Sequence, residues 1–328
     1  NFIAFLDDDD LWGQDYLKNM KERIELEQPD CLIGKLDQYS EILEGIENTN
    51  YKIVCNNKPY ILTIFEKRVR NKDLPFFMDL KLYLNKNKFK CPKPVKNKNK
   101  EIINPIKNKK GVIISFIEGK KITKPNSNSC FEVGKMIGEL HKVSVNFKKK
   151  RRNTLSLIEL NKLFKQCKRS KKNKKFSNLI DTLNNEIEFL VSVPPMKLPS
   201  GIVHADLFMD NIFFKNKKIS GVIDFYFSCD HFLLYDIAIA INEWCFKNNG
   251  KNFQKDFFKS LVKGYNKYRK LKVNEMRAFN TILRIAAVRI LVTRLYDYIF
   301  HQKNAVVIKK DPIQYLNILK WHQRNYLS

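Results

Sequence analysis

One segment in the second half of the chain restricts its possible folds more than any other feature. It reads Ile202-Val203-His204-Ala205-Asp206-Leu207-Phe208-Met209-Asp210-Asn211, and Gly221-Val222-Ile223-Asp224-Phe225 follows it. Two carboxylates, Asp206 and Asp224, and the amide Asn211 therefore flank short apolar runs. Runs of this kind, bounded by turn residues, are typical of buried strands. The pattern predicts a rigid β framework that holds these three polar groups.

These residue types suit one kind of chemistry. Phosphoryl transfer needs a base that orients the attacking hydroxyl and oxygen ligands for magnesium ions that neutralise the phosphates. The order His-x-Asp-x-x-x-x-Asn, then an apolar strand and an Asp, is the order that kinase-fold enzymes use. The alternative is a polar loop followed by a hairpin with an incidental Asp, which requires the spacing and both apolar runs to agree by accident. The segment predicts a kinase.

Composition agrees with a large globular enzyme. The 328 residues are 44% hydrophobic and 12% aromatic, enough for one two-lobed domain or two domains and unlike a disordered chain. The net charge of +27 would suit a nucleic-acid partner, but only 12 of the 61 basic residues are Arg. The lysines accompany many Asn and Ile residues and gather in stretches 96–110 and 148–175, as expected from coding bias and solvated loops. We therefore expect no nucleic-acid partner, because phosphate binding favours Arg.

Cysteine usage and hydropathy favour a cytoplasmic protein. The seven cysteines form no Cys-x-x-Cys pair and no cluster with metal spacing, and they stand at positions 31, 55, 91, 130, 167, 229 and 245. Such a set, in a chain without a signal peptide, indicates reduced thiols. No apolar run reaches the ~20 residues that span a bilayer, and three arginines interrupt the most apolar segment, 281–300. We expect no membrane partner.

The pattern of secondary structure predicts an α+β, bilobal fold. Two alternating apolar runs, 51–55 and 59–65, flank Asn56-Asn57-Lys58 and predict a β-hairpin. Stretch 148–176 shows little pattern except charge. Further elements are a strand over 111–117 and helices over 73–84 (with Asp73 as N-cap), 130–143, 176–190, 232–246, 253–268, 274–300 and 312–326. The first third is mostly β and the remainder mostly α.

Several segments together resemble one family. They are Gly201 to Phe214, Ile219 to Cys229, Glu44 to Tyr51, Tyr60 to Val69, Asp73-Leu74-Pro75-Phe76-Phe77, Leu234 to Ile239 and Arg294-Leu295-Tyr296-Asp297. From about residue 36 to its end, the chain resembles homoserine kinases of the aminoglycoside-phosphotransferase-like type, in the protein-kinase-like superfamily. The resemblance implies a small antiparallel β-sheet N-lobe over 36–114, a hinge over 115–119 and a helical C-lobe over 120–328. It also implies ATP-dependent phosphorylation of the L-homoserine side-chain hydroxyl, giving O-phospho-L-homoserine for threonine biosynthesis, with ATP and Mg²⁺ as cofactors.

The resemblance also implies roles for the residues of the motif. Asp206 would be the base that orients or accepts the proton of the substrate hydroxyl. Asn211 and Asp224 would hold magnesium against the ATP phosphates. His204 would be structural, bonding the backbone beside Asp224 and fixing the catalytic loop.

On the ATP side, the resemblance places a loop over the phosphates and a hinge at the adenine. The loop would run from Gly45 to Asn50 and use backbone N–H groups with the amides of Asn48 and Asn50. The hinge segment that receives adenine would include Ser115, Phe116 and Ile117. Many relatives carry a Lys or Arg on the second hairpin strand, where this chain has Thr63. Strand alternation allows Lys67 to supply the charge, and a solvated strand end is the alternative.

Homoserine carries a carboxylate and an ammonium besides its hydroxyl, so its site needs a cation and an anion or carbonyl. The segment 281–300 offers Arg284, Arg289, Arg294 and Asp297, and helical spacing places the last two on one face. Structural ion pairs are the alternative for each. Pocket wall or core is expected for Tyr226, Phe227 and Trp244. Asp236 fits a buried carboxylate that holds the catalytic loop better than a ligand.

Residues 1–35 differ from the start of a homoserine kinase. Ile3-Ala4-Phe5-Leu6-Asp7-Asp8-Asp9-Asp10-Leu11-Trp12 resembles the metal-binding strand end of a family 2-type glycosyltransferase. So short a piece lacks the nucleotide-binding sheet of such an enzyme, so we interpret it as a foreign or remnant segment and expect no glycosyl transfer. For the rest of the chain two further hypotheses stay open: a kinase of another small amino-alcohol, and a catalytically silent basic binding protein.

Overall fold

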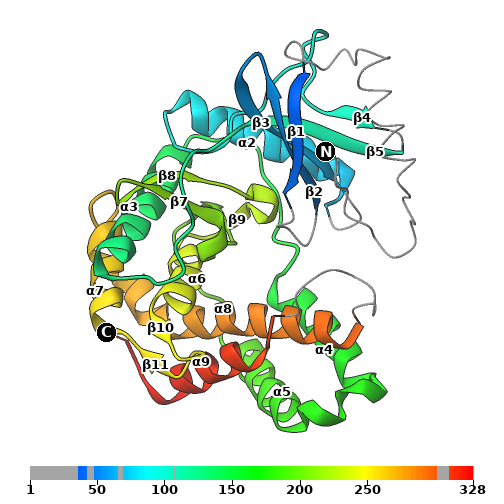
Figure 1. Ribbon diagram of the computed structural model, residues 1–328. Helices are drawn as coiled ribbons and strands as arrows, with labels where there is room; N and C mark the ends of the chain where they lie inside the picture. Colours follow the sequence, from blue (N-terminus) through cyan, green and yellow to red (C-terminus); the bar gives the residue numbers. More distant parts are fainter. Residues whose placement is uncertain (1–35, 43–47, 66–68, 107, 301–309, 328) are drawn as a thin grey trace. The chain divides into compact units, whose positions relative to one another are not determined.

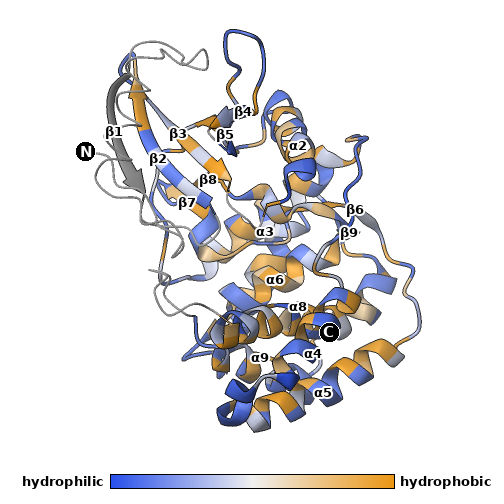
Figure 2. Ribbon diagram, turned by 90° about the vertical axis from the view of Figure 1, so that its right-hand side faces the viewer, coloured by the Kyte–Doolittle hydropathy of each residue, from blue (hydrophilic) through white to orange (hydrophobic). Residues whose placement is uncertain are grey.

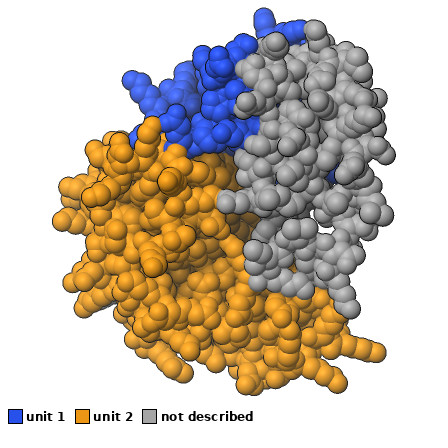
Figure 3. Space-filling model, viewed as in Figure 1, with its two compact units in different colours: residues 1–118, 302–307 blue, residues 119–301, 308–328 orange. Residues whose placement is uncertain are grey.

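The computed structural model describes residues 36–42, 48–65, 69–106, 108–300 and 310–327, with 36–42 described by their backbone alone. The segment interpreted as foreign or remnant, 1–35, lies outside the described residues. The described chain divides into two compact units, one up to residue 118 and one from residue 119 onward (Figure 3). The predicted hinge, 115–119, contains this division. Its role as a hinge stays a prediction.

The first unit is built on one antiparallel sheet with strand order β1-β2-β3-β5-β4 (Figure 1). Its strands are β1 (Leu36–Ile42), β2 (Asn48–Cys55), β3 (Lys58–Phe65), β4 (Asn104–Ile106) and β5 (Lys109–Ser115). The turn between β2 and β3 works because Asn56 and Asn57 both adopt positive φ, 49° and 59°, which a two-residue hairpin of type I′ requires and Asn tolerates. The short η1 (Asn71–Asp73) and the helix α2 (Leu74–Lys86) complete this unit.

The described part of the second unit is mainly helical and contains three small β pairs. Its helices are α3 (Ser127–Ser144), α4 (Leu157–Arg169), η2 (Lys171–Phe176), α5 (Ser177–Ser192), η3 (Met209–Asn211), η4 (Phe225–Phe227), α6 (Leu234–Trp244), α7 (Lys255–Tyr265), α8 (Val273–Phe300) and α9 (Ile313–Arg324). Its strands pair as β6 (Ser200–Val203) with β9 (Cys229–Phe232), β7 (Ile212–Lys215) with β8 (Lys218–Val222), and β10 (Phe246–Lys247) with β11 (Asn252–Phe253). The hairpin β7–β8 and the pairing of β6 with β9 bring the two parts of the catalytic motif together.

Helices α3 and α7 approach each other closely because glycines stand at the contact. A Cβ on Gly134 would lie 1.9 Å from the carbonyl oxygen of Leu261, and one on Gly264 would lie 2.0 Å from that of Phe131. No larger residue fits either position without separating the helices. α3 itself begins at a capping box, in which Asn126 and Ser129 each accept the other's backbone N–H at 2.9 Å.

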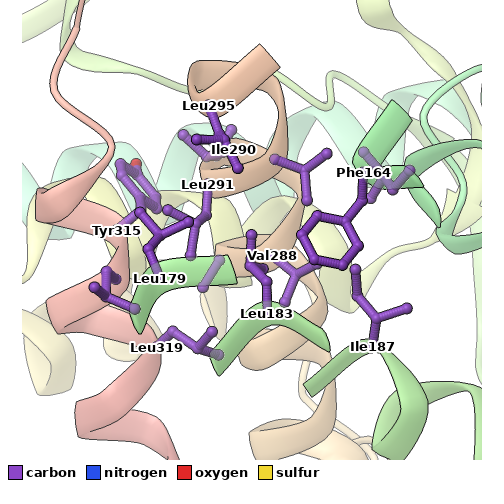
Figure 4. Close-up of a cluster of buried hydrophobic side chains, with 14 of the residues drawn as sticks. Phe164, Leu179, Leu183, Ile187, Val288, Ile290, Leu291, Leu295, Tyr315 and Leu319 are labelled. Carbon is purple, nitrogen blue, oxygen red and sulfur yellow. The ribbon is translucent and has the colours of Figure 1, made fainter. Parts of the chain in front are cut away.

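The main hydrophobic cluster of the second unit lies where α4, α5, α8 and α9 meet. Phe164, Leu183 and Val288 point toward one another from three of these helices (Figure 4). α6 is apolar along almost its whole length (Figure 2), and every residue in it except Glu243 is buried. A helix buried on nearly all sides forms a rigid support for the loops above it.

Most predicted elements are confirmed, with three corrections. Stretch 148–176 contains α4, because Leu160, Phe164 and Cys167 form a buried helical stripe beneath the surrounding charges. The predicted phosphate loop overlaps β2, which begins at Asn48 and pairs on both sides. Asp73 stands at the N-cap of α2 without capping it; its carboxylate accepts from Arg70 instead, at 2.7 Å.

Candidate active site

Asp206 lies in the loop after β6, and its carboxylate is held at both oxygens. Asn211 Nδ2 donates to Oδ2 at 3.0 Å and to the Asp206 backbone carbonyl at 2.8 Å. Arg289 Nη2 from α8 donates to Oδ1 at 3.0 Å. The Asp206 side chain is 13% exposed, so a small molecule can still reach it. Both partners fix the direction of the carboxylate before any substrate binds.

His204 joins this loop to the segment that carries Asp224. Its Nε2 lies 2.9 Å from the carbonyl oxygen of Ile223, and its Nδ1 accepts the Asp206 N–H at 3.2 Å. Because a carbonyl only accepts, Nε2 carries the proton and the ring is neutral in this tautomer. The contact expected from the sequence, to the backbone beside Asp224, is present.

Asn211 and Asp224 provide oxygen atoms of the kind that magnesium prefers. Among the described residues, the side chain of Asn211 makes hydrogen bonds through Nδ2 only, which leaves Oδ1 for a metal. The Ile223 N–H donates to the Asn211 carbonyl at 2.9 Å, so Asp224 follows directly beside Asn211. Asp224 itself has a left-handed backbone, φ 62° and ψ 61°. Strain of this kind in a non-glycine residue costs about 1–3 kcal/mol and is concentrated at functional sites.

Asp236 holds the backbone of the catalytic loop, as the sequence predicted. Its carboxylate accepts the N–H of His204 at 2.8 Å and that of Ala205 at 2.7 Å, and it is fully buried. Ala205 has φ 63°, a conformation that costs a non-glycine residue energy and persists only where surrounding contacts impose it. Two charge-assisted hydrogen bonds from consecutive N–H groups are such contacts.

A buried polar chain continues from Asp236 to the far end of α7. His141 Nε2 lies 3.1 Å from Asp236 Oδ2, and its Nδ1 lies 3.0 Å from the Tyr265 hydroxyl. Because a carboxylate only accepts, Nε2 donates and Nδ1 accepts the hydroxyl proton. Arg269 Nη1 donates to the same hydroxyl oxygen at 2.9 Å and also pairs with Glu275. Each member therefore keeps the next in one orientation.

The arginines predicted for the acceptor have different surroundings. Arg289 is 4% exposed, pairs with Asp206 and lies over the Phe227 ring, 5.0 Å from its centroid. Arg284, in contrast, is in a structural ion pair, with two 2.7 Å hydrogen bonds to Glu186 of α5. Arg294 donates from Nη1 to Gln314 Oε1 at 2.8 Å and to the Asp311 carbonyl at 3.2 Å.

Asp297 and Tyr226 are the other two residues predicted to contact the acceptor. Asp297 contributes to the environment of α4: burial raises the pKa of the Cys167 thiol to about 12, and the negative charge of Asp297 adds to that shift. Arg294, one turn earlier on α8, stacks on Tyr315 of α9. Tyr226 is 8% exposed, within η4 directly after Asp224. Substrate contacts by both residues stay predictions.

The described residues among those proposed for ATP lie in the first unit. Thr63 is 2% exposed and donates to Asn50 Oδ1 at 2.8 Å, and Asn50 Nδ2 donates to the Asn48 carbonyl at 3.3 Å. Gly45 and Lys67 lie outside the described residues.

The predicted adenine segment begins at the end of β5. Ser115 Oγ accepts the Lys93 N–H at 2.9 Å, and the Lys52 ammonium lies 5.1 Å from the Phe116 ring centroid. Ile117 follows, partly buried. Nucleotide contacts by these residues stay predictions.

The sequence did not predict the series of buried hydrogen bonds that continues beyond Asp236. His141, Tyr265 and Glu275 each sit singly within an apolar helical pattern. A polar residue on an apolar helix face indicates a buried hydrogen bond. Its partner, however, lies on another helix and cannot be predicted from the spacing of residues. Trp244, whose Nε1 donates to the Leu207 carbonyl at 3.0 Å, was expected only as core or pocket wall.

Comparison with known sequences identifies the family of the chain. A family described as "Phosphotransferase enzyme family" matches residues 38–271. A homoserine kinase of Bartonella henselae is 40% identical over 298 residues, 90% of this chain and 91% of that protein. A homoserine kinase of Agrobacterium fabrum is 39% identical over 292 residues, 89% of this chain and 90% of its own length.

Solved structures support the fold at lower identity. An amicoumacin kinase in complex with AMP-PNP and Ca²⁺ has a TM-score of 0.65 at 17% identity, covering 95% of this chain and 94% of its own. A Plasmodium vivax ethanolamine kinase has a TM-score of 0.65 at 18% identity, covering 97% and 90%. The α+β, protein-kinase-like fold expected from the sequence is confirmed. No described helix is long and apolar enough to cross a membrane.

Proposed function

We propose that this chain, which belongs to the phosphotransferase enzyme family and to the homoserine kinases within it, transfers the γ-phosphoryl group of ATP to the side-chain hydroxyl of L-homoserine. The products are O-phospho-L-homoserine, an intermediate on the way to threonine, and ADP, which leaves with the oxygen that bridged the β- and γ-phosphates. We further propose a cytoplasmic location and no nucleic-acid or membrane partner.

The observation that carries the proposal is the Asp206 carboxylate, fixed by Asn211 on one oxygen and by Arg289 on the other, at 3.0 Å each. Each carboxylate oxygen accepts about two hydrogen bonds, so both remain able to accept one from a substrate hydroxyl. Asp206 would orient that hydroxyl toward the γ-phosphate and take its proton as the new P–O bond forms. Positioning of this kind is the main part of phosphoryl-transfer catalysis.

Magnesium fits the residues beside this base. Asn211 Oδ1 and the Asp224 carboxylate would hold it, and Mg²⁺ ordinarily completes its octahedron with water and phosphate oxygens. When bound with ATP, the metal would neutralise the phosphate charge. His204 would keep the two ligand segments in register, because its ring bonds both. ATP would be received by the residues predicted in the first unit, Asn48, Asn50 and Ser115 to Ile117 with Gly45 and Lys67.

The test is Asp206→Asn, assayed with Mg-ATP and L-homoserine. We expect turnover to fall about 10²–10⁴-fold, the usual contribution of a positioned base, while Mg-ATP affinity measured by calorimetry stays unchanged. Asp181→Asn is the matched control, because Asp181 is exposed on α5. Near-normal turnover by Asp206→Asn would remove Asp206 from the role of base.

A further inference from the structure

The end of α6 carries a carboxylate whose hydrogen-bonding capacity is largely unused. Glu243 is partly buried, whereas every other residue of this helix is fully buried. The Tyr315 hydroxyl donates to its Oε2 at 3.0 Å, and among the described residues this is its only side-chain hydrogen bond. A carboxylate has about four acceptor positions. Oε1 therefore remains available to a bound molecule.

Arg294 offers the complementary group on the other side of Tyr315. Its guanidinium lies over the Tyr315 ring, 4.5 Å from the centroid, and its bonds to described residues use only Nη1. Within the described part of the chain, Nη2 and Nε are therefore available for the two-point contact that guanidinium makes with a carboxylate. No ion pair within 4 Å joins Arg294 to Glu243 in the described part of the chain.

Glu243 and Arg294 are both connected to the catalytic loop through neighbouring residues. Trp244, the residue after Glu243, donates from Nε1 to the carbonyl of Leu207, which directly follows Asp206. Asp210 of the same loop accepts a hydrogen bond from Lys310 at 2.9 Å. Lys310 directly precedes Asp311, whose backbone carbonyl accepts from Arg294 at 3.2 Å.

Electrostatics support a cationic ligand at Glu243. Burial raises the pKa of the Glu243 carboxyl, although Arg294, Lys310 and the Tyr315 hydroxyl act in the opposite direction. The protein's own partners therefore compensate its charge incompletely. An ammonium group bound there would complete that compensation.

We propose that Glu243 binds the ammonium and Arg294 the carboxylate of the acceptor, so that the enzyme selects α-amino acids with a terminal hydroxyl. This inference rests on the proposed function, since it places the head group of homoserine while its hydroxyl, two methylene groups away from the α-carbon, reaches Asp206. Asp210 and Lys310, paired at 2.9 Å, border the same site. Tyr315 contacts both binding groups, Arg294 through its ring face and Glu243 through its hydroxyl.

The test compares three acceptors with Glu243→Gln and Arg294→Met. 4-Hydroxybutanoate lacks the ammonium and 3-aminopropan-1-ol lacks the carboxylate. For Glu243→Gln we expect kcat/KM for homoserine to fall at least about 30-fold, the smaller end of the cost of breaking a desolvated charge pair, with 4-hydroxybutanoate unaffected. For Arg294→Met we expect the same fall in kcat/KM for homoserine, with 3-aminopropan-1-ol unaffected.

Glu188→Gln is the control, because Glu188 is exposed on α5. The amide that Glu243→Gln introduces retains an oxygen that accepts from Tyr315. If this variant fails to fold, Glu243→Asp should raise KM for homoserine but not for 4-hydroxybutanoate. Equal falls for all acceptors, or no fall for homoserine, would overturn the head-group site and leave the proposed function intact. No turnover of homoserine by the unmodified protein would overturn both.

Discussion

Replacing Asp236 by Asn tests whether a buried carboxylate sets the shape of the catalytic loop. Oδ2 of Asp236 accepts from both the His204 N–H and His141 Nε2, while Oδ1 accepts from the Ala205 N–H. An amide has only one accepting oxygen, so at least one donor must face the new NH₂ group. Losing a charge-assisted bond costs about 1.5–3 kcal/mol, and stranding a buried donor about 1–3 kcal/mol more.

We therefore expect Asp236→Asn to lower the free energy of unfolding by about 3–5 kcal/mol and to reduce kcat, since Ala205 loses the contact that holds its left-handed backbone. Urea unfolding followed by circular dichroism gives the first quantity, and steady-state assays with Mg-ATP and homoserine give the second. Asp181→Asn makes the same chemical change at an exposed position. A variant with normal kcat, at a temperature where it is folded, would refute the anchoring role.

Three further changes test other parts of the structure. Gly134→Ala should cost about 3 kcal/mol of stability or more, because its Cβ would lie 1.9 Å from the Leu261 carbonyl oxygen; an unchanged melting temperature would contradict the close helix contact. Arg284→Leu should lower the free energy of unfolding by about 3–5 kcal/mol, because it leaves buried Glu186 unpaired. Adding Glu186→Leu to the same chain should restore part of that loss. Denaturant unfolding of both variants measures the two effects. Burial lowers the pKa of His322 to about 3 from an ordinary 6.5, and Arg284 adds to that shift. The unfolded chain thus binds a proton below pH 6.5 that the folded protein excludes, so stability falls as the pH falls, by about 2 kcal/mol at pH 5. His322→Gln should reduce this dependence of stability on pH. Denaturant unfolding of the unmodified protein and the variant at pH 7 and pH 5 measures the difference.

The sequence predicted the local parts of the site well because local spacing determines them. The turn after β6 places Asp206 and Asn211 five residues apart, and both bond within that same turn. Asn56 and Asn57 similarly fix the β2–β3 turn through their own backbone preference. The helices after residue 230 could be predicted because their apolar stripes are long and regular.

Contacts between distant segments could not be obtained in the same way. The bond from Arg289 to Asp206 joins residues 83 positions apart, and the one from Tyr315 to Glu243 joins residues 72 apart. The sequence indicated that Arg289 and Arg294 are cations of one helix, but it did not indicate which of them contacts Asp206. Helix α4 was missed because its lysines conceal a narrow apolar stripe, which only the packing against α8 makes visible.

The most direct test of the whole account is phosphorus NMR of the purified protein with Mg-ATP and L-homoserine, with L-serine, choline and an aminoglycoside as parallel acceptors. The account predicts a new phosphomonoester resonance, assigned to O-phospho-L-homoserine, in the homoserine sample alone, and its loss with Asp206→Asn. Product formation only with another acceptor would contradict homoserine as the substrate. No phosphoryl transfer to any of the four would contradict the assignment of this site as a small-molecule kinase centre.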